Sequence, residues 1–366
     1  MVEMEKYKLG DICEIVSGST PKTNIDEYWE GTIKWITPAE LNDDTYIITD
    51  SVRKITELAV KKTGLKSFPE GTVILSSRAP IGKVAIAGCE MYCNQGFKNL
   101  ICSKKINNKY LYWFLKGNTV FLNSLGRGAT FKELSKSIVS NIEINLPDIV
   151  YQKKAVETLE KVSEIIALRK RELSSLDDLI KARFVEMFGN PATPGDKFKT
   201  CKLGEVADVK SSHRVFTTEF VAEGVPFYRG TEIGVLASGQ QPEDSYRISM
   251  EHYRKIASDD SKPMRGDLLL PSICNKGQVW MVDTDEPFYY KDGRVLCISP
   301  ERSVFDSRYL QFYMKLRTEA EYPKLGSGST FAEFKIFQLK ELEVDIPPMN
   351  SQKSFDLFAD QVDKSK

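Results

Sequence analysis

The sequence predicts an α+β protein made of two tandem copies of one unit, each a mixed, β-rich domain followed by a long helix. Two observations support this prediction. Segments of the first half recur in the same order in the second half at a nearly constant separation. In each copy, segments rich in Val, Ile, Tyr and Phe and broken by Gly, Pro and Asn give way to a stretch without Gly or Pro. The first pattern is typical of strands and turns, and the second of a helix.

The repeat consists of matched segments. KLGDICEIVSG begins at Lys8, and KLGEVADVKSS follows 194 residues later. GTVILSSRAPIGKVAIA begins at Gly71, and GDLLLPSICNKGQVWMV follows 195 residues later. The pair Gln152-Lys153 recurs 200 residues later as Gln352-Lys353. Ordered matches with a slowly drifting offset indicate a duplication, whose second copy gained about six residues in loops.

Each copy repeats the same series of expected elements. A short strand opens the copy, and a β-rich middle region with loops follows. A short helix comes next, at 109–115 in the first copy and 308–316 in the second. A Gly-rich turn, a second short helical run and a strand leading to proline complete the domain. We therefore expect globular domains at 1–150 and 191–348, a spacer helix at 151–190, and the beginning of a second such helix at 349–366.

The stretch Tyr151–Phe188 is expected to be one helix of roughly 57 Å, at 1.5 Å per residue. Its apolar residues recur at spacings of three and four. They are Leu159, Val162, Ile166, Leu173, Leu176, Ile180 and Met187. Gly189-Asn190-Pro191 is a typical helix stop. Such a helix is too long to bury its apolar stripe against one small domain, so we expect it to pair with another helix.

The second copy begins the same helix with Phe355, Phe358 and Val362 in matching positions, but the counterpart of Ala167–Phe188 is lacking. We therefore expect an exposed apolar stripe on the first helix at about Leu173–Met187. An exposed stripe of this kind predicts self-association or dependence on a partner chain.

The composition excludes some functional classes. The 51 basic and 51 acidic residues balance, so charge alone gives no indication of nucleic-acid binding. The seven cysteines contain no CxxC pair, which favours reduced thiols over a metal site. The N-terminus MVEMEKYKLG lacks an apolar signal segment, and no apolar run is long enough to span a membrane. We expect a cytoplasmic protein.

Three segments together resemble the specificity subunits of type I restriction–modification systems. They are YKLGDICEIVSGSTP from Tyr7, LGRGATFKELSKSIVSNIEINLP from Leu125, and QKKAVETLEKVSEIIALRKRELSSLDDLIKARFVEMFGNP from Gln152. The resemblance covers almost the whole chain. It implies two target recognition domains separated by long helices that pack antiparallel as spacers, with each domain reading one half of a bipartite DNA site.

The resemblance also implies partners. Modification subunits would carry the S-adenosylmethionine chemistry, and restriction subunits would carry ATP-driven translocation and Mg²⁺-dependent cleavage. The chain itself would have no catalytic residues, no metal and no cofactor. Its ligand would be double-stranded DNA.

Loops at matching positions in the two copies provide the candidate DNA contacts. Arginine can donate two hydrogen bonds to guanine, lysine usually contacts phosphate, and Asn or Gln can pair with adenine. The candidates in the first copy are Lys22, Ser77, Arg78, Lys83, Gln95, Lys98, Arg127, Thr130 and Lys132. Those in the second copy are Arg214, Arg229, Ser272, Asn275, Lys276, Arg294, Ser329 and Thr330.

Each loop also has a purely structural interpretation, as a solvated turn or a helix cap. Phe131 and Phe331 are expected to be core anchors. The matched acids Glu40 and Glu232 could accept a hydrogen bond from cytosine, but an acid that holds a loop together is the favoured interpretation.

Other functions fit the sequence less well. An adenine methyltransferase needs an Asn/Asp-Pro-Pro-aromatic turn, but Pro347-Pro348 is followed by Met349. A nuclease needs clustered carboxylates. Glu333-Phe334-Lys335 gives an isolated ExK sequence, and aligning the copies puts Leu134 opposite its acid. Two alternatives remain open: the specificity subunit of a type IIB-like system, and a helical assembly scaffold that does not bind DNA.

Overall fold

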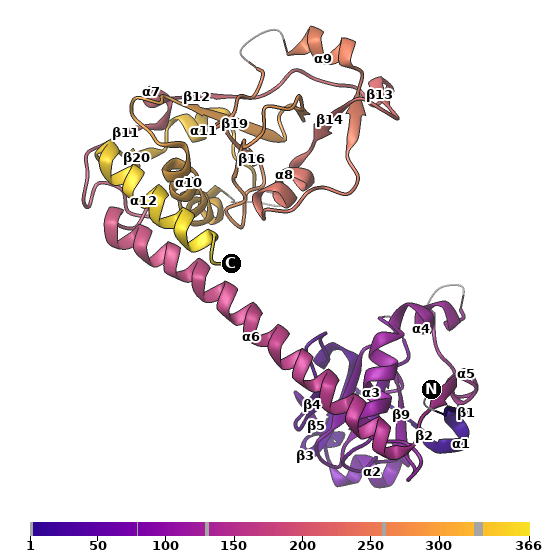
Figure 1. The fold of residues 1–366 in the computed structure, drawn as a ribbon. Helices are drawn as coiled ribbons and strands as arrows, with labels where there is room; N and C mark the ends of the chain where they lie inside the picture. The colour runs from indigo at the N-terminus through magenta and orange to yellow at the C-terminus, as the bar shows by residue number, and fades with distance from the viewer. Residues whose placement is uncertain (1–2, 79, 129–131, 258–260, 326–331) are drawn as a thin grey trace. The chain divides into compact units, whose positions relative to one another are not determined.

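The computed structural model describes residues 3–78, 80–128, 132–257, 261–325 and 332–366. They form two compact units, Met1–Arg169 (unit 1) and Lys170–Lys366 (unit 2). The division falls inside the long helix α6, Ile149–Phe188, so each unit contains one part of this helix (Figure 1).

The described part of unit 1 contains three β-sheets. A five-stranded sheet has the order β2-β9-β6-β7-β4, a three-stranded sheet has the order β5-β3-β8, and β1 pairs with β10. The strands are β1 Glu5–Lys8, β2 Cys13–Ser17, β3 Trp29–Ile36, β4 Ile47–Ile48, β5 Arg53–Ile55, β6 Val73–Ser76, β7 Val84–Ala87, β8 Tyr92–Cys93, β9 Phe97–Cys102 and β10 Glu143–Leu146. The helices before α6 are α1 Leu9–Ile12, η1 Asp26–Tyr28, η2 Pro38–Glu40, α2 Glu57–Thr63, α3 Asn108–Gly117, α4 Thr119–Leu125 and α5 Lys136–Ser140.

Unit 2 repeats this topology. Its four-stranded sheet β12-β19-β16-β17 matches β2-β9-β6-β7, and β11 pairs with β20 as β1 does with β10. A third sheet has the order β13-β15-β14-β18. The strands are β11 Thr200–Lys202, β12 Ala207–Lys210, β13 Phe220–Val221, β14 Val225–Tyr228, β15 Tyr246–Ile248, β16 Leu268–Pro271, β17 Trp280–Met281, β18 Tyr289–Tyr290, β19 Val295–Pro300 and β20 Glu343–Asp345. The helices after α6 are α7 Leu203–Val206, η3 Thr217–Glu219, α8 Gly230–Ala237, α9 Met250–Ile256, α10 Ser307–Glu321, η4 Tyr322–Leu325, α11 Ile336–Lys340 and α12 Met349–Asp363.

The shared topology includes an unusual detail. In each unit a strand with an antiparallel neighbour on one side has a parallel neighbour on the other: β3 lies between β5 and β8 in unit 1, and β14 between β15 and β18 in unit 2. The predicted α+β class and the tandem duplication are therefore both present in the structure.

Strand β6 shows why the central strands read as continuous apolar runs. All four of its residues are buried. Val73 and Leu75 belong to the core beneath α3, while Ile74 belongs to a second core on the other face of the sheet. Strand β16 is buried on both faces in the same way. A strand covered on both faces loses the apolar–polar alternation of a surface strand.

Helix α6 begins two residues before the expected Tyr151. The carboxylate of Asp148 accepts hydrogen bonds from the backbone N–H groups of Val150 and Tyr151, at 2.8 and 2.9 Å, and so caps the helix. The helix ends at Phe188, where Gly189 has a φ of 87°, the left-handed conformation expected after a helix.

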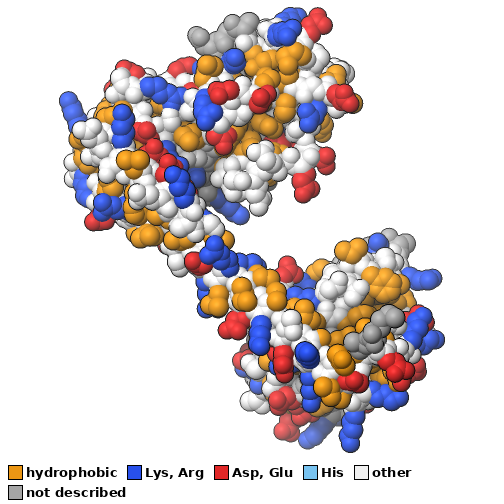
Figure 2. All heavy atoms as spheres, in the orientation of Figure 1, with side chains coloured by type: hydrophobic (Ala, Val, Ile, Leu, Met, Phe, Trp, Pro, Cys, Tyr) orange, Lys and Arg blue, Asp and Glu red, His pale blue; other side chains and the backbone are white. Residues whose placement is uncertain are grey.

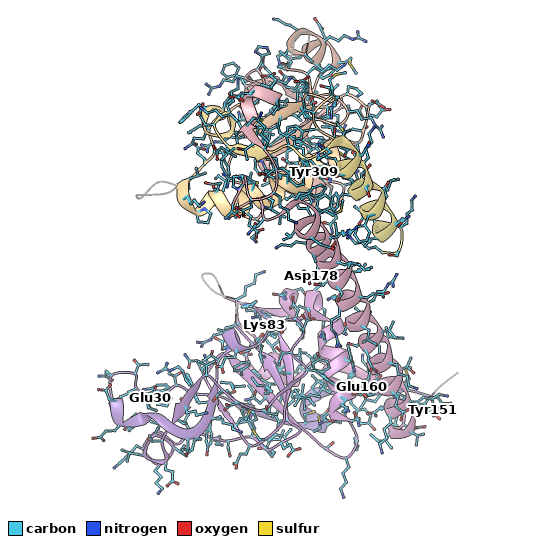
Figure 3. The ribbon with its side chains drawn as sticks, turned by 90° about the vertical axis from the view of Figure 1, so that its left-hand side faces the viewer. Glu30, Lys83, Tyr151, Glu160, Asp178 and Tyr309 are labelled. Atoms are coloured by element: carbon cyan, nitrogen blue, oxygen red, sulfur yellow. The ribbon has the colours of Figure 1, made fainter. Side chains whose placement is uncertain are left out.

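The first turns of α6 are attached to unit 1 by a buried amide. The Gln152 side chain accepts from the Asn107 backbone N–H at 2.8 Å and donates to the carbonyls of Lys105 and Pro147, at 3.0 and 2.9 Å. Lys109 Nζ also forms an ion pair with Glu160 Oε1 at 2.8 Å. Figure 3 labels Tyr151 and Glu160 on this part of the helix.

Unit 2 attaches α12 in the same way. Gln352 accepts from the Asp306 backbone N–H at 2.8 Å and donates to the carbonyls of Val304 and Pro347, both at 2.9 Å. Arg308 forms an ion pair with Asp360 at 2.6 Å, in the position of the Lys109–Glu160 pair. The repeated Gln-Lys dipeptide therefore marks the junction of each helix with its domain.

The C-terminal part of α6 lies in the core of unit 2. Ile180, Phe184 and Phe188 are buried there, and the Phe184 ring lies 5.1 Å from that of Phe355 on α12. Phe358 and Val362 of α12 belong to the same core. The expectation that Leu173–Met187 stays exposed does not hold, because α12 is long enough to cover this end of the helix: Leu173, Leu176 and Met187 are half-buried.

Most exposed apolar residues in the middle of α6 lie earlier than expected, although Leu179 and Val185 are also exposed. The earlier group is Leu159, Val162, Ile165, Ile166 and Leu168. Val162 is 47% exposed, whereas its counterpart Val362 on α12 is 8% exposed. We call these five residues the mid-helix stripe.

We predict that Gln352→Ala lowers the free energy of unfolding by about 2–3 kcal/mol, because it leaves one buried carbonyl, one partly buried carbonyl and one partly buried N–H without partners. Urea denaturation followed by circular dichroism measures this change. Lys353→Ala, at the exposed neighbouring position, is the control and should change stability by less than about 0.5 kcal/mol. Equal stability of the two variants would contradict the role given to Gln352.

Candidate nucleic-acid interface

Three loops meet around one serine in each unit. In unit 1 the Ser77 backbone N–H donates to the Gly96 carbonyl at 2.7 Å, and the Ser77 carbonyl accepts from Leu134 N–H at 2.8 Å. In unit 2 the Ser272 N–H donates to the Arg294 carbonyl at 2.9 Å, and the Ser272 carbonyl accepts from Phe334 N–H at 2.8 Å. The loops after β6 or β16, before β9 or β19, and before α5 or α11 are thereby brought together.

The two serines organise these loops from the inside. Ser77 and Ser272 are both buried. The Ser77 hydroxyl accepts from Lys98 Nζ at 3.3 Å, and the Ser272 hydroxyl donates to Glu333 at 3.4 Å. Neither side chain is presented to a ligand, so we do not retain Ser77 and Ser272 as direct DNA contacts.

A carboxylate lies beside each serine and pairs with two basic side chains. Glu133 pairs with Arg78 Nε at 3.0 Å and with Lys98 Nζ at 3.4 Å. Glu333 pairs with Arg294 at 2.8 Å and also with Lys335. Hydrogen bonding to Lys335 holds the pKa of Glu333 below its usual value despite its partial burial. We call these two groups the carboxylate clusters.

The alignment that puts Leu134 opposite Glu333 is wrong by one residue. The backbone bonds to Ser77 and Ser272 put Leu134 opposite Phe334, so the counterpart of Glu333 is Glu133. The offset of 200 between the flanking glycine-rich turns was the available sequence signal. Both copies therefore have the acid, and each acid is neutralised by basic side chains.

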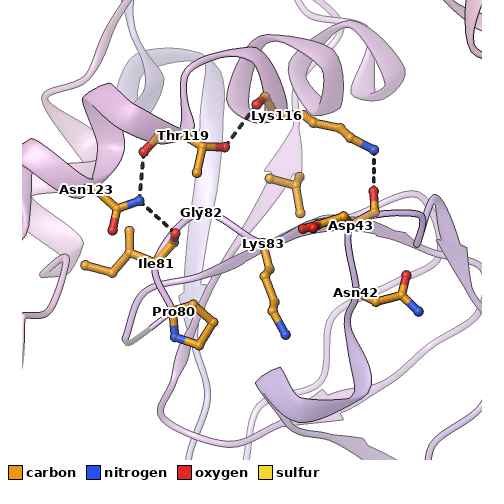
Figure 4. Close-up of a pocket in the computed structure, with 10 residues that line it drawn as sticks. Asn42, Asp43, Pro80, Ile81, Gly82, Lys83, Lys116, Thr119 and Asn123 are labelled. Carbon is orange, nitrogen blue, oxygen red and sulfur yellow. Dashed lines mark hydrogen bonds between the residues drawn. The ribbon is translucent and has the colours of Figure 1, made fainter. Parts of the chain in front are cut away.

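Two predicted lysines of unit 1 are used inside the unit. Lys98 is buried, and its Nζ donates to the Ser77 hydroxyl and to the Glu133 carboxylate. Lys83 Nζ donates to the backbone carbonyls of Pro38, at 3.3 Å, and Leu41. Lys83 also lines a hollow of about 300 Å³ (Figure 4). The structure gives both lysines a role in holding loops, so neither is retained as a phosphate contact.

Other candidates remain on the surface. Besides Arg78, Arg229 and Arg294, which are exposed but ion-paired, the exposed candidates are Lys22, Gln95, Arg127 and Lys132 in unit 1, and Arg214, Asn275 and Lys276 in unit 2. Gln95 is hydrogen-bonded to the Thr20 hydroxyl. The Arg214 guanidinium lies 5.2 Å from the centre of the Phe216 ring. Thr130, Ser329 and Thr330, and with them Phe131 and Phe331, lie outside the described residues.

The matched acids Glu40 and Glu232 are structural. Glu40 accepts from the backbone N–H groups of Thr37 and Val52, both at 2.8 Å. Glu232 accepts from the Arg229 backbone N–H at 2.8 Å and from its guanidinium at 2.7 and 3.1 Å. Each carboxylate holds a loop at the start of a short helix, as the favoured interpretation has it. Arg229 is thereby committed to Glu232 and also lies over the Tyr246 ring.

Charge is mixed over the surface. Figure 2 shows basic and acidic side chains interspersed on the visible face of each unit. Among the described residues no group of three His, Cys, Asp or Glu side chains could hold a metal ion. Within the same part of the chain, the helices include none whose length and hydropathy suit a membrane span.

The Arg229–Glu232 pair predicts a pH dependence of stability. Burial raises the pKa of Glu232, but hydrogen bonds from Arg229 outweigh it and hold the pKa below the ordinary 4.5. A carboxylate with a depressed pKa stabilises the fold above its unfolded pKa, and this contribution is lost as pH falls through the folded value. Glu232→Gln should therefore cost about 1 kcal/mol at pH 7, and less as the pH falls below about 4.5.

Urea denaturation between pH 7 and pH 3 tests this prediction. Glu223→Gln, which changes an exposed acid of the same unit, is the control. A stability difference between wild type and Glu232→Gln that stays constant with pH would contradict the assignment.

Comparison with known proteins identifies relatives. Residues 1–177 match the family model of the type I restriction modification DNA specificity domain. The MjaIX specificity subunit of a type I restriction enzyme from Methanocaldococcus jannaschii is 40% identical over 195 residues, which are 52% of this chain and 44% of that protein. The MjaVIII specificity subunit of the same organism is 23% identical, and the match covers 96% of this chain and 84% of that one.

A solved structure shares the fold. It comes from work on complex assembly and conformational transition of the type I R-M system, and it matches 100% of this chain and 92% of the solved one, with a TM-score of 0.57 and 19% identity. The matches to MjaIX and MjaVIII span different shares of those relatives, less than half of one and most of the other. By the family model over residues 1–177 and by these two relatives, the chain is similar to the specificity subunits of type I restriction–modification systems.

Proposed function

We propose that this chain is the non-catalytic DNA-recognition subunit of a type I restriction–modification complex and that each unit reads one half of a bipartite site. The observation that carries the proposal is the repeated meeting of three loops at Ser77 and Ser272. The scaffold of these loops is the same in both units, while the side chains exposed on them differ. Two copies of one scaffold with different exposed side chains suit the reading of two unlike half-sites.

The exposed candidates divide between the units. Arg127 and Gln95 lie on the loops of unit 1, and Asn275 and Lys276 on the loop after β16 in unit 2. Arginine suits guanine, and Asn or Gln suits adenine. Because charges of both signs are interspersed, we expect weak binding by the chain alone and stronger binding within the assembled complex.

The proposal includes the partners. Modification subunits would supply the S-adenosylmethionine chemistry, and restriction subunits the ATP- and Mg²⁺-dependent steps. This chain would supply the sequence information and docking surfaces on its helices. We expect such a complex to act in the cytoplasm.

The mid-helix stripe supports self-association as part of the proposal. Residues 159–168 of one copy can lie antiparallel against the same residues of a second copy, which is the geometry of a twofold-symmetric interface. Val362, at the position of Val162, is covered by the C-terminal part of α6, so a helix is the kind of element that covers this face in unit 2.

The recognition role predicts a two-part selected motif. The chain co-expressed with its modification subunit is mixed with a random duplex library at rising salt, and the recovered fragments are sequenced. Arg127→Ala should relax one half of the motif and Asn275→Ala the other, each by about tenfold in preference. Lys353→Ala, on the exposed face of α12, should leave the motif unchanged. Recovery without any sequence preference would contradict the recognition role.

Self-association predicts a dimer that the stripe controls. Sedimentation velocity of the purified chain from 1 to 100 μM, on the order of weak helix-pair affinities, should show a concentration-dependent dimer. Ile165→Glu combined with Ile166→Glu should abolish the dimer, since it buries charge in the interface. Leu357→Glu, at an exposed apolar position of α12, should not. A wild-type monomer at all concentrations would refute the dimer.

A further inference from the structure

In the two carboxylate clusters the acid has the same position, but its basic partners come from different positions. Glu133 and Glu333 each come directly before the residue whose backbone N–H bonds to the buried serine. The acid is therefore fixed at the same point of both units by the main chain. The basic side chains that reach it come from different places.

In unit 1 the arginine comes from the loop after β6, as Arg78, and the lysine from β9, as Lys98. In unit 2 the arginine is Arg294, directly before β19, and the lysine is Lys335, directly before α11. The counterpart of Arg78 is Ile273, by the offset of 195. In each unit an arginine pairs with the acid, but the two arginines do not occupy matching positions.

The pairing leaves donors of both arginines available. Arg78 uses Nε for Glu133, and Arg294 uses one terminal nitrogen for Glu333. A guanidinium has five N–H donors in a rigid fork, so an edge of each remains for a second partner. Both side chains also remain accessible, at 45% exposure for Arg78 and 62% for Arg294.

An acid at this point also affects DNA without contacting it. A carboxylate repels phosphate and offsets the charge of the arginine, so it weakens sequence-independent attraction to the backbone. The guanidinium can still donate hydrogen bonds to the edge of a base. The carboxylate also restricts the orientation of the guanidinium. The effect favours discrimination between sequences over total affinity.

We propose that Glu133 and Glu333 are specificity-determining positioning residues, which hold Arg78 and Arg294 for guanine readout and suppress non-specific binding. The proposal rests on the proposed function. It makes the acid, which carries no information about sequence, responsible for how strictly each half-site is read. Arg78 becomes a guanine reader in unit 1 beside Arg127, and Arg294 becomes one in unit 2 beside Asn275.

Glu133→Gln tests the proposal in the complex with the modification subunit. Binding to a selected duplex and to a scrambled duplex is measured by fluorescence anisotropy across a salt series. For the scrambled duplex we expect tighter binding and a salt slope steeper by about one, the value for one additional phosphate contact. The preference at one guanine position should fall about tenfold. Glu133→Asp should restore part of it, and Glu333→Gln should affect only the other half-site.

A double-substitution cycle separates positioning from a general effect on the fold. Arg78→Ala should lose the same guanine preference, and adding Glu133→Gln to Arg78→Ala should change that preference no further. If Glu133→Gln leaves both the salt slope and the base preference at the wild-type values, the positioning role is refuted while the recognition function stands. If the wild-type complex itself selects no motif, the proposed function fails and this inference fails with it.

Discussion

The junction between each domain and its long helix depends on one buried amide. Gln152 and Gln352 each satisfy a backbone N–H and two carbonyls at the point where the last strand, the helix α3 or α10 and the long helix converge. An apolar residue would leave three polar groups unpaired, and a charged residue could not donate and accept in this pattern. The amide therefore joins the first turns of each helix to its own domain, and the packing of those turns depends on this residue.

The sequence was sufficient to predict the duplication, the α+β class and the two helices. Gln152 and Gln352, at the offset of 200, make the same hydrogen bonds at a structural junction. This explains why the two copies have the same residue here while most neighbouring residues differ. Exposure along α6 was not predictable in the same way. The periodicity identifies an apolar face, but which part of that face is covered depends on packing partners far away in the chain. Phe184 is covered by α12, whereas Ile165 remains exposed.

The candidate interface shows a similar limit. Arg127 and Asn275 are on the surface as expected, but Lys83 and Lys98 are turned inward by carbonyls and by Glu133. The sequence alone does not distinguish a loop lysine that faces solvent from one whose side chain bonds to a neighbouring loop. Glu133 was detectable, because its match to Glu333 lies in the same register as the glycines that precede both. It was missed through a shift of one residue in the alignment.

The pairing of β1 with β10 has an evolutionary consequence. Glu5 lies opposite Leu146, and in unit 2 Thr200 lies opposite Asp345, so the β-rich domain of each unit begins and ends on two adjacent strands. Everything between these strands can be exchanged for another chain segment of any length, provided that the strand pair and the glutamine that follows it are kept. Recombination between related genes at these points would therefore exchange one whole domain and keep the junction with its helix. Under the proposed function, a single such event would replace one half of the recognised DNA site.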